Sequence, residues 1–288
     1  MTRTTGAKNI IAWDKRSSVP TTDSTQIKHL FTSATSNPLR EFQNSMSHQR
    51  NYLSWIDTRH EELSKLKKTK DSTFKKYRWY AEQQTLFEAV NAFEVFFKNT
   101  FIVLGEALKA YIPAEQIKGS VDARIVWTLR GKTSAPALIF EHQLFHDLEQ
   151  IDKASYMLIE ARRYNTSNPS EAMRSTVKAL QGIFQIRHTL AHNQGYVTTS
   201  DAAKFQLVGY SVKKLEVIDP QKDQTGESIR RFLQQEAKSY TAWLLEKTAC
   251  YLGKYHQQTG IELQGASLNR IEGAFGKNAS LSALPWKK

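Results

Sequence analysis

Residues 86–108 read LFEAVNAFEVFFKNTFIVLGEAL, and this stretch decides the fold class of the chain. Its large apolar residues recur every three or four positions, which places them on one continuously buried face of an α-helix. These residues are Leu86, Val90, Phe93, Phe97, Phe101, Leu104 and Leu108. We expect the helix to begin near Asp71 or Ser72 and to end near Ile112, because Pro113 cannot continue it.

Helical signals continue on both sides of this stretch. Asn37 and Pro38 predict the start of another helix, since Asn is a good N-cap and Pro at the first helical position leaves no N–H unpaired. Asn168 and Glu171 have the spacing of a capping box and predict a further start. The remaining helical patterns cover residues 120–131, 136–163 and 228–256. The sequence therefore predicts an all-α fold, a bundle of long helices.

Three regions depart from the helical pattern. Residues 1–36 are rich in Ser and Thr without a sustained period, which predicts a mostly flexible arm. Residues 204–218 are rich in β-branched and aromatic types and predict a small β-rich insertion. Residues 261–288 lose the helical period and predict a flexible basic tail. Between these regions we expect an accessory helix within 37–70 and the main helical domain over 71–260.

The charge of the chain points to polyanionic partners. Forty Lys and Arg residues against 28 Asp and Glu residues give a formal net charge of +12. This charge attracts RNA, DNA or anionic surfaces at long range. No apolar run is long enough to span a bilayer, the first residues lack the apolar centre of a secretory signal, and the only cysteine, Cys250, has no partner for an intramolecular disulfide. We therefore expect no membrane contact and a cytoplasmic location.

The densest basic cluster lies within residues 65–78, beside Tyr77, Trp79 and Tyr80. Lysines and arginines neutralise phosphates, and aromatic rings stack on bases. The candidate RNA-binding residues of this cluster are Lys67, Lys68, Lys75, Lys76 and Arg78. A solvated helix face or a junction between helices is the alternative explanation.

Residues 185–195 read QIRHTLAHNQG and hold the densest group of reactive side chains. Arg187 can grip a phosphate through two N–H groups and stays charged at any relevant pH. His192 can take or give a proton near neutrality, because the pKa of an imidazole is about 6.5. Together they could serve RNA cleavage without a metal, in which the ribose 2′-OH attacks the adjacent phosphorus. His188 and Asn193 are candidate supporting residues.

The spacing of this pair sets a geometric condition. On an unbroken helix, Arg187 and His192 would point about 140° apart, so they could not easily reach one phosphate. Either the helix ends between them, which Asn193 and Gly195 favour, or a second chain completes the site. A symmetric dimer would also let one His192 act as base and its mate as acid. A structural alternative is that these side chains simply interact with the dipole at a helix C-terminus.

The order Arg187-His188-Thr-Leu-Ala-His192 resembles the motif of the HEPN superfamily, helical domains of many ribonucleases and toxins. In that motif a polar residue follows the arginine, and a histidine stands a few positions later. The acidic Glu94 within the apolar run 86–98 is also similar to the family pattern. The likeness covers about residues 74–260, and its specific part is the Arg-His segment. His188 is a departure, because Asn is commoner at that position.

The resemblance implies a metal-independent endoribonuclease that needs no cofactor and works as a homodimer with its motifs facing across the interface. His192 would be the acid and base, Arg187 the phosphate anchor, and His188 a residue that shapes the site. Glu94 would hold Arg187 in place, or it pairs with Lys98 one turn away. Family members of this size are often toxins or antiviral effectors that cut tRNA or mRNA, so an antitoxin or a defence-system partner is also expected.

Two other functions fit the same residues. His188 and His192 stand four positions apart, a spacing that zinc ligands use, but position 189 is Thr rather than the Glu of a zinc protease helix and no cysteine cluster adds ligands. A non-catalytic RNA-binding or interaction module is the stronger alternative, because some HEPN domains lack activity and charge alone attracts RNA. This alternative predicts RNA binding that survives the loss of His192.

Overall fold

The computed structural model describes residues 37–66, 71–119 and 134–287, and these are mostly α-helical. The helices are α2 (Pro38–Lys65), α3 (Asp71–Leu108), α5 (Ala135–Phe140), α6 (Leu148–Ile159), α7 (Glu171–Asn193), α8 (Thr199–Leu207), α9 (Thr225–Thr259), α10 (Gly265–Phe275) and α11 (Ala279–Ser282), with short 3-10 turns η2 (Ala114–Gln116) and η3 (Lys222–Gln224). Two short strands, β1 (Leu263–Gln264) and β2 (Trp286–Lys287), pair in parallel. The all-α prediction is confirmed. None of the helices in these described ranges has the length and apolar character needed to cross a membrane.

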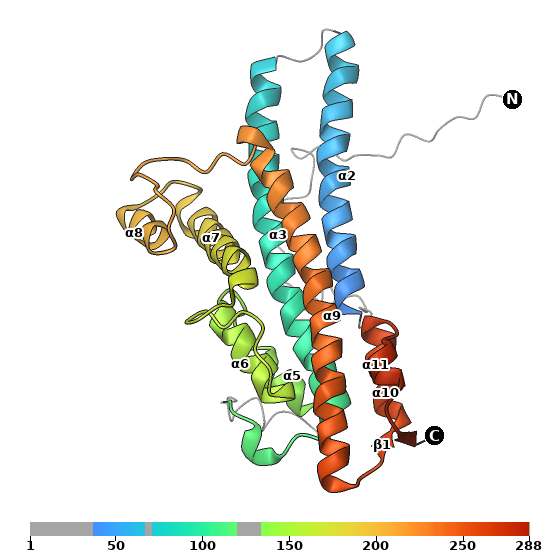
Figure 1. Cartoon of the computed structure of the whole chain (residues 1–288). Helices are drawn as coiled ribbons and strands as arrows, with labels where there is room; N and C mark the ends of the chain where they lie inside the picture. The colour runs from blue at the N-terminus through green and yellow to red at the C-terminus, as the bar shows by residue number, and fades with distance from the viewer. Residues whose placement is uncertain (1–36, 67–70, 120–133, 288) are drawn as a thin grey trace, which may run out of the picture. The chain divides into compact units, whose positions relative to one another are not determined.

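Helix α3 is the centre of the core. It runs beside α2 and α9 and also contacts α5, α6, α7 and α10 (Figure 1). Each of its seven predicted core residues is at most 1% exposed, so the predicted buried face is confirmed. The ring of Tyr240 on α9 meets the ring of Phe97 edge-on, with centroids 4.8 Å apart. Rings in this arrangement bury large apolar areas and attract one another, which fixes α9 against α3.

Helix α2 starts where the sequence predicts. The side-chain oxygen of Asn37 accepts a hydrogen bond from the backbone N–H of Arg40, and Pro38 occupies the first turn. Although α2 was expected as an accessory helix, its Phe42 and Met46 are 2% and 1% exposed and belong to the same core as α3. The predicted arm over residues 1–36 and the predicted helix over 120–131 lie outside the described residues.

Two predicted helix boundaries are wrong. The single helix expected over 136–163 is divided into α5 and α6, and the Asp147 side chain caps the start of α6 by accepting from the backbone N–H of Glu149. Helix α7 begins at Glu171 with Ser170 as its N-cap, so Asn168 does not form the expected capping box. The side chain of Asn165 instead donates to the backbone carbonyl of Asn168, which holds that residue in a turn.

The β-rich insertion predicted over 204–218 is also wrong. Residues 204–207 belong to α8, and the following segment contributes only an isolated bridge between Tyr196 and Val217. Thr198 and Asp201 form a reciprocal capping box that starts α8, and this local signal outweighs the β-branched composition. Gly209, with a φ of +86°, follows the end of the helix.

The flexible tail predicted over 261–288 is wrong for residues 261–287, which form short helices and strands packed on the core. Leu263, Ile271 and Leu281 are each 0% exposed, and α10 packs against α2 and α3. The indole N–H of Trp286 donates to the carbonyl of Leu281 at 2.7 Å. The segment was misread because its helices are short and rich in small residues, so their few buried side chains produce a weak periodic signal.

Candidate functional site

Arg187 lies at the contact between α7 and α3. Its Nε–H donates to Oδ1 of Asn91 at 3.0 Å, and Nε lies 3.3 Å from Oε1 of Glu94. The guanidinium carbon stands 5.6 Å from the centroid of the Phe87 ring. Within the described residues no hydrogen bond engages the Nη1 and Nη2 atoms, and the side chain is 24% exposed. The guanidinium is therefore anchored by the hydrogen bond of its Nε, and within the described chain its Nη groups make no hydrogen bond.

Glu94 is a buried carboxylate whose nearest charged partner is Arg187. Its side chain is 13% exposed, and Oε1 makes no hydrogen bond, so the contact with Arg187 is electrostatic. Burial raises the pKa of Glu94, and the positive charges of Arg187, His146 and Lys98 only partly oppose that rise. The sequence left open whether Glu94 pairs with Arg187 or with Lys98, and in the structure it pairs with Arg187.

His188 and His192 form a pair on the solvent side of α7. Their ring centroids are 4.7 Å apart, His192 is exposed, and His188 is half-buried. Burial lowers the pKa of His188, and the nearby positive charges of Lys204 and His192 lower it further. His188 is therefore neutral at pH 7 and has a ring nitrogen able to accept a proton or a hydrogen bond.

Asp201 at the start of α8 fixes the C-terminal end of α7. Its carboxylate accepts from the side-chain amides of Asn193 at 2.8 Å and Gln185 at 3.0 Å, and from the hydroxyl of Thr198 at 2.8 Å. Burial would raise the pKa of Asp201, but these Thr198 and Asn193 hydrogen bonds bring it below its usual value. Sequence reasoning missed Asp201, although its Thr-x-x-Asp spacing was the available signal.

Helix α7 continues unbroken to Asn193 and ends with Gln194 in the left-handed region. The expectation that the helix ends between Arg187 and His192 is therefore wrong. Arg187 contacts α3, whereas His192 contacts His188 on the exposed face, and no contact within the described chain joins Arg187 to His192. A site that uses both side chains on one phosphate would need a second chain.

The predicted RNA-binding cluster divides into different environments. Lys67 and Lys68 lie outside the described residues, while Lys75 and Lys76 are exposed in the first turns of α3. Arg78 is not a free cation, because its Nε–H donates to Asp57 at 2.7 Å and its Nη1 binds Glu82. These intramolecular pairs favour a structural role for Arg78, and its part in RNA binding stays a prediction. Arg78 also lies 13 positions before Asn91 on α3, about 20 Å along the helix axis.

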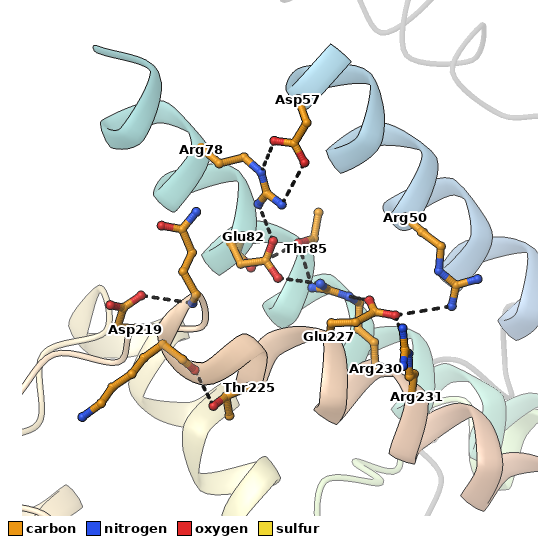
Figure 2. Close-up of polar contacts among 12 residues, drawn as sticks. Arg50, Asp57, Arg78, Glu82, Thr85, Asp219, Thr225, Glu227, Arg230 and Arg231 are labelled. Atoms are coloured by element: carbon orange, nitrogen blue, oxygen red, sulfur yellow. Dashed lines mark hydrogen bonds and ion pairs between the residues drawn. The ribbon is translucent and has the colours of Figure 1, made fainter. Parts of the chain in front are cut away.

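Arg78 belongs instead to an ion-pair cluster that joins α2, α3 and α9 (Figure 2). Glu82 lies between Arg78 and Arg230, and the side chains of Glu82 and Arg230 are 6% and 4% exposed. Arg230 also donates to the hydroxyl of Thr85 at 3.2 Å. The hydrogen bonds to Asp57 and Glu82 outweigh desolvation and raise the pKa of Arg78. Mutual pairing of these charges indicates a structural clamp rather than a binding site.

The comparisons with known proteins give no family. No protein-family model, curated protein or solved structure matches this chain. Within the described residues, His188 and His192 are not joined by a third His, Cys, Asp or Glu in a group that could hold a metal ion. The resemblance to HEPN domains thus depends on the Arg187–His192 spacing and on Glu94.

Proposed function

We propose that this chain is a metal-independent endoribonuclease that uses Arg187 and His192. The anchoring of Arg187 carries the proposal: Asn91 and Glu94 hold its Nε, while Nη1 and Nη2 make no hydrogen bond among the described residues. A guanidinium fixed in this way is preorganised to bind a phosphate through two parallel N–H groups. The net charge of +12 favours binding of a polyanion such as RNA.

The reaction would need one proton taken and one proton given. A base removes the proton of the ribose 2′-OH, the 2′ oxygen attacks phosphorus, and the bond from phosphorus to the 5′ oxygen breaks. An acid protonates that leaving oxygen, so the products are a 2′,3′-cyclic phosphate and a 5′-OH. Arg187 would stabilise the negative charge on the phosphoryl oxygens during the attack.

We infer that two copies of the chain assemble this site. Arg187 and His192 point about 140° apart on the continuous α7, so one chain cannot easily place both on one phosphate. In a symmetric dimer, one His192 acts as base and the His192 of the second copy as acid. We place the activity in the cytoplasm, on tRNA or mRNA, as a toxin or antiviral effector with an antitoxin or defence-system partner.

A non-catalytic RNA-binding module is the second candidate function. The contacts of Arg187 with Asn91, Glu94 and Phe87 favour it, because they would stabilise the packing of α7 on α3 without any reaction. Both functions predict RNA binding that weakens with salt, so binding alone does not distinguish them.

Cleavage of a labelled RNA in the presence of EDTA tests the proposal. We expect wild type to release 2′,3′-cyclic phosphate ends and His192→Ala to cleave about 10² to 10⁴ times more slowly, while binding RNA within about threefold of wild type. The matched control is His48→Ala, an exposed histidine on α2 that should cleave as wild type does. No cleavage by wild type would support the binding module instead, and equal cleavage by His192→Ala would contradict the catalytic role of His192.

The dimeric arrangement has its own test. Wild type and His192→Ala are mixed in equal amounts and allowed to exchange subunits. The mixture should have about one quarter of the activity of wild type alone at the same total protein concentration, because only about one quarter of the dimers carry two His192 side chains. If each chain acts alone, about one half should remain.

A further inference from the structure

An apolar cavity of about 480 Å³ lies between α7, the end of α8 with the segment 210–218 that follows it, and the beginning of α9. Its walls include Ile183, Ile186, Phe205, Val217, Ile229 and Phe232. Small-molecule sites in proteins are concave, mostly apolar and about 300 to 1,000 Å³ in volume. The size and lining of this cavity fit that description. It belongs neither to the Arg187 contact nor to the ion-pair cluster.

Hydrogen bonds near both ends fix the segment 209–218. On one side, Ile218 N–H donates to the carbonyl of Gly195 and Leu215 N–H donates to the carbonyl of Val197, both at 2.9 Å. On the other side, the Tyr210 hydroxyl donates to the carbonyl of Lys178 at 3.4 Å. The segment therefore forms a strap along the cavity, tied to the α7–α8 loop near Ile218 and to α7 itself at Tyr210.

Gly182 is required for the wall that Tyr210 forms. A Cβ atom at position 182 would lie 2.7 Å from Cε2 of the Tyr210 ring, closer than real Cβ contacts allow. The missing side chain lets the ring lie directly on α7, with the Lys178 ammonium 5.1 Å from its centroid. This wall of the cavity therefore depends on the close packing of the Tyr210 ring against Gly182.

The polar groups of the lining limit the chemistry of a ligand. Among the described residues that line the cavity, Glu216 is the one charged group, and Thr225 and Ser228 add hydroxyls. Glu216 is exposed, and its carboxylate accepts from the backbone N–H of Lys213 at 2.9 Å, so it stands at the open rim of the cavity. A carboxylate disfavours an anion and favours a hydrogen-bond donor or a cation.

We propose that this cavity binds a small molecule with an apolar body and a hydrogen-bond donor, such as an amine, at one end. The cavity opens to solvent, so a fitting apolar ligand would remove its apolar walls from contact with water. The three-sided enclosure and the small volume favour a compact molecule over a helix or strand of another protein. The inference does not depend on the proposed nuclease activity.

Titration of the full chain with 1-aminoanthracene, an uncharged aromatic amine that fluoresces in apolar surroundings, tests this proposal. We expect saturable binding of one probe per chain. Ala179 lines the cavity, so Ala179→Phe should fill it and weaken binding at least tenfold. The matched control is Ala172→Phe, an exposed position on the same helix outside the lining, which should bind within twofold of wild type.

A second variant keeps the test decisive if Ala179→Phe does not fold. Val217 lines the cavity from the strap and is 39% exposed, so Val217→Trp can enter the cavity without disturbing the core. Absence of saturable binding to wild type would overturn the proposal. So would undiminished binding by a folded filling variant, or a stoichiometry of one probe per two chains, which would indicate an interface between copies.

Discussion

Nε of Arg187 on α7 lies 3.3 Å from Oε1 of Glu94 on α3, across 93 positions of sequence. The contact places a charge of each sign in the seam between two helices that also bury Phe93 and Phe184. Burial nevertheless raises the pKa of Glu94, so the fold favours the protonated carboxyl more than the unfolded chain does. This relationship makes the stability contribution of Glu94 depend on pH.

We expect Glu94→Gln to gain stability relative to wild type as the pH rises from about 4 to 7. A raised pKa in the fold means that the contribution of Glu94 is fully present below its unfolded pKa and is lost as the pH rises through its folded pKa. Glutamine mimics the protonated carboxyl and does not titrate. Urea unfolding of both proteins at several pH values measures the difference. A difference that stays constant over this range would contradict the buried, pKa-raised state of Glu94.

The positive charge of Lys204 should contribute to the lowered pKa of His188. Because burial and the nearby positive charges lower the pKa of His188, we expect its ring to titrate below the ordinary value of about 6.5 in an NMR titration. Lys204→Gln should raise that pKa, whereas Lys213→Gln, an exposed lysine on the strap, should leave it unchanged. Since the folded pKa is depressed, the stability supplied by neutral His188 is present above its unfolded pKa and is lost as the pH falls through the folded one.

The cluster in Figure 2 should be far more sensitive to substitution than an exposed ion pair. Glu82→Ala would leave Arg78 and Arg230 facing each other without their shared carboxylate, so we expect a loss of about 3 to 5 kcal/mol in the free energy of unfolding. The control is Glu62→Ala, which removes a pair with Arg59 in which both side chains are more than half exposed. That change should cost at most about 1 kcal/mol. The free energies of unfolding are measured with denaturant. Equal losses for Glu82→Ala and Glu62→Ala would contradict the role of the cluster as a structural clamp.

Gly226 should tolerate no side chain at the start of α9. An added Cβ would lie 2.6 Å from Oε1 of Glu82 and 3.1 Å from the carbonyl oxygen of Pro220, so Gly226→Ala should destabilise the fold by about 1 to 3 kcal/mol. Gly273 on α10 has nothing within 4 Å of its added Cβ. Gly273→Ala should therefore stabilise by about 0.5 to 1 kcal/mol, because alanine is the better helix former. Thermal unfolding of the two variants should shift in opposite directions.

The sequence by itself determined the helical class, the buried face of α3 and the start of α2. These features depend on repeats of three or four residues and on a cap next to the helix that it starts, so they are visible in a short window of sequence. It also singled out Arg187, within a segment dense in reactive side chains, whereas Glu94 was proposed through the resemblance to HEPN domains. For the helices and for Arg187, local pattern was enough because each signal lies within one or two helical turns.

Only the tertiary structure decided which groups meet. It paired Arg78 with Asp57 and Glu82, tied Asn193 to Asp201, and buried Leu263 within a segment that looks disordered in sequence. The partner of a side chain depends on how elements that are distant in sequence pack together. In the same way, a single apolar side chain such as Leu263 is buried by surfaces that lie far away in the chain. The structure also decided between the two arrangements left open for Arg187 and His192. Helix α7 is continuous through both positions, so the two side chains face apart.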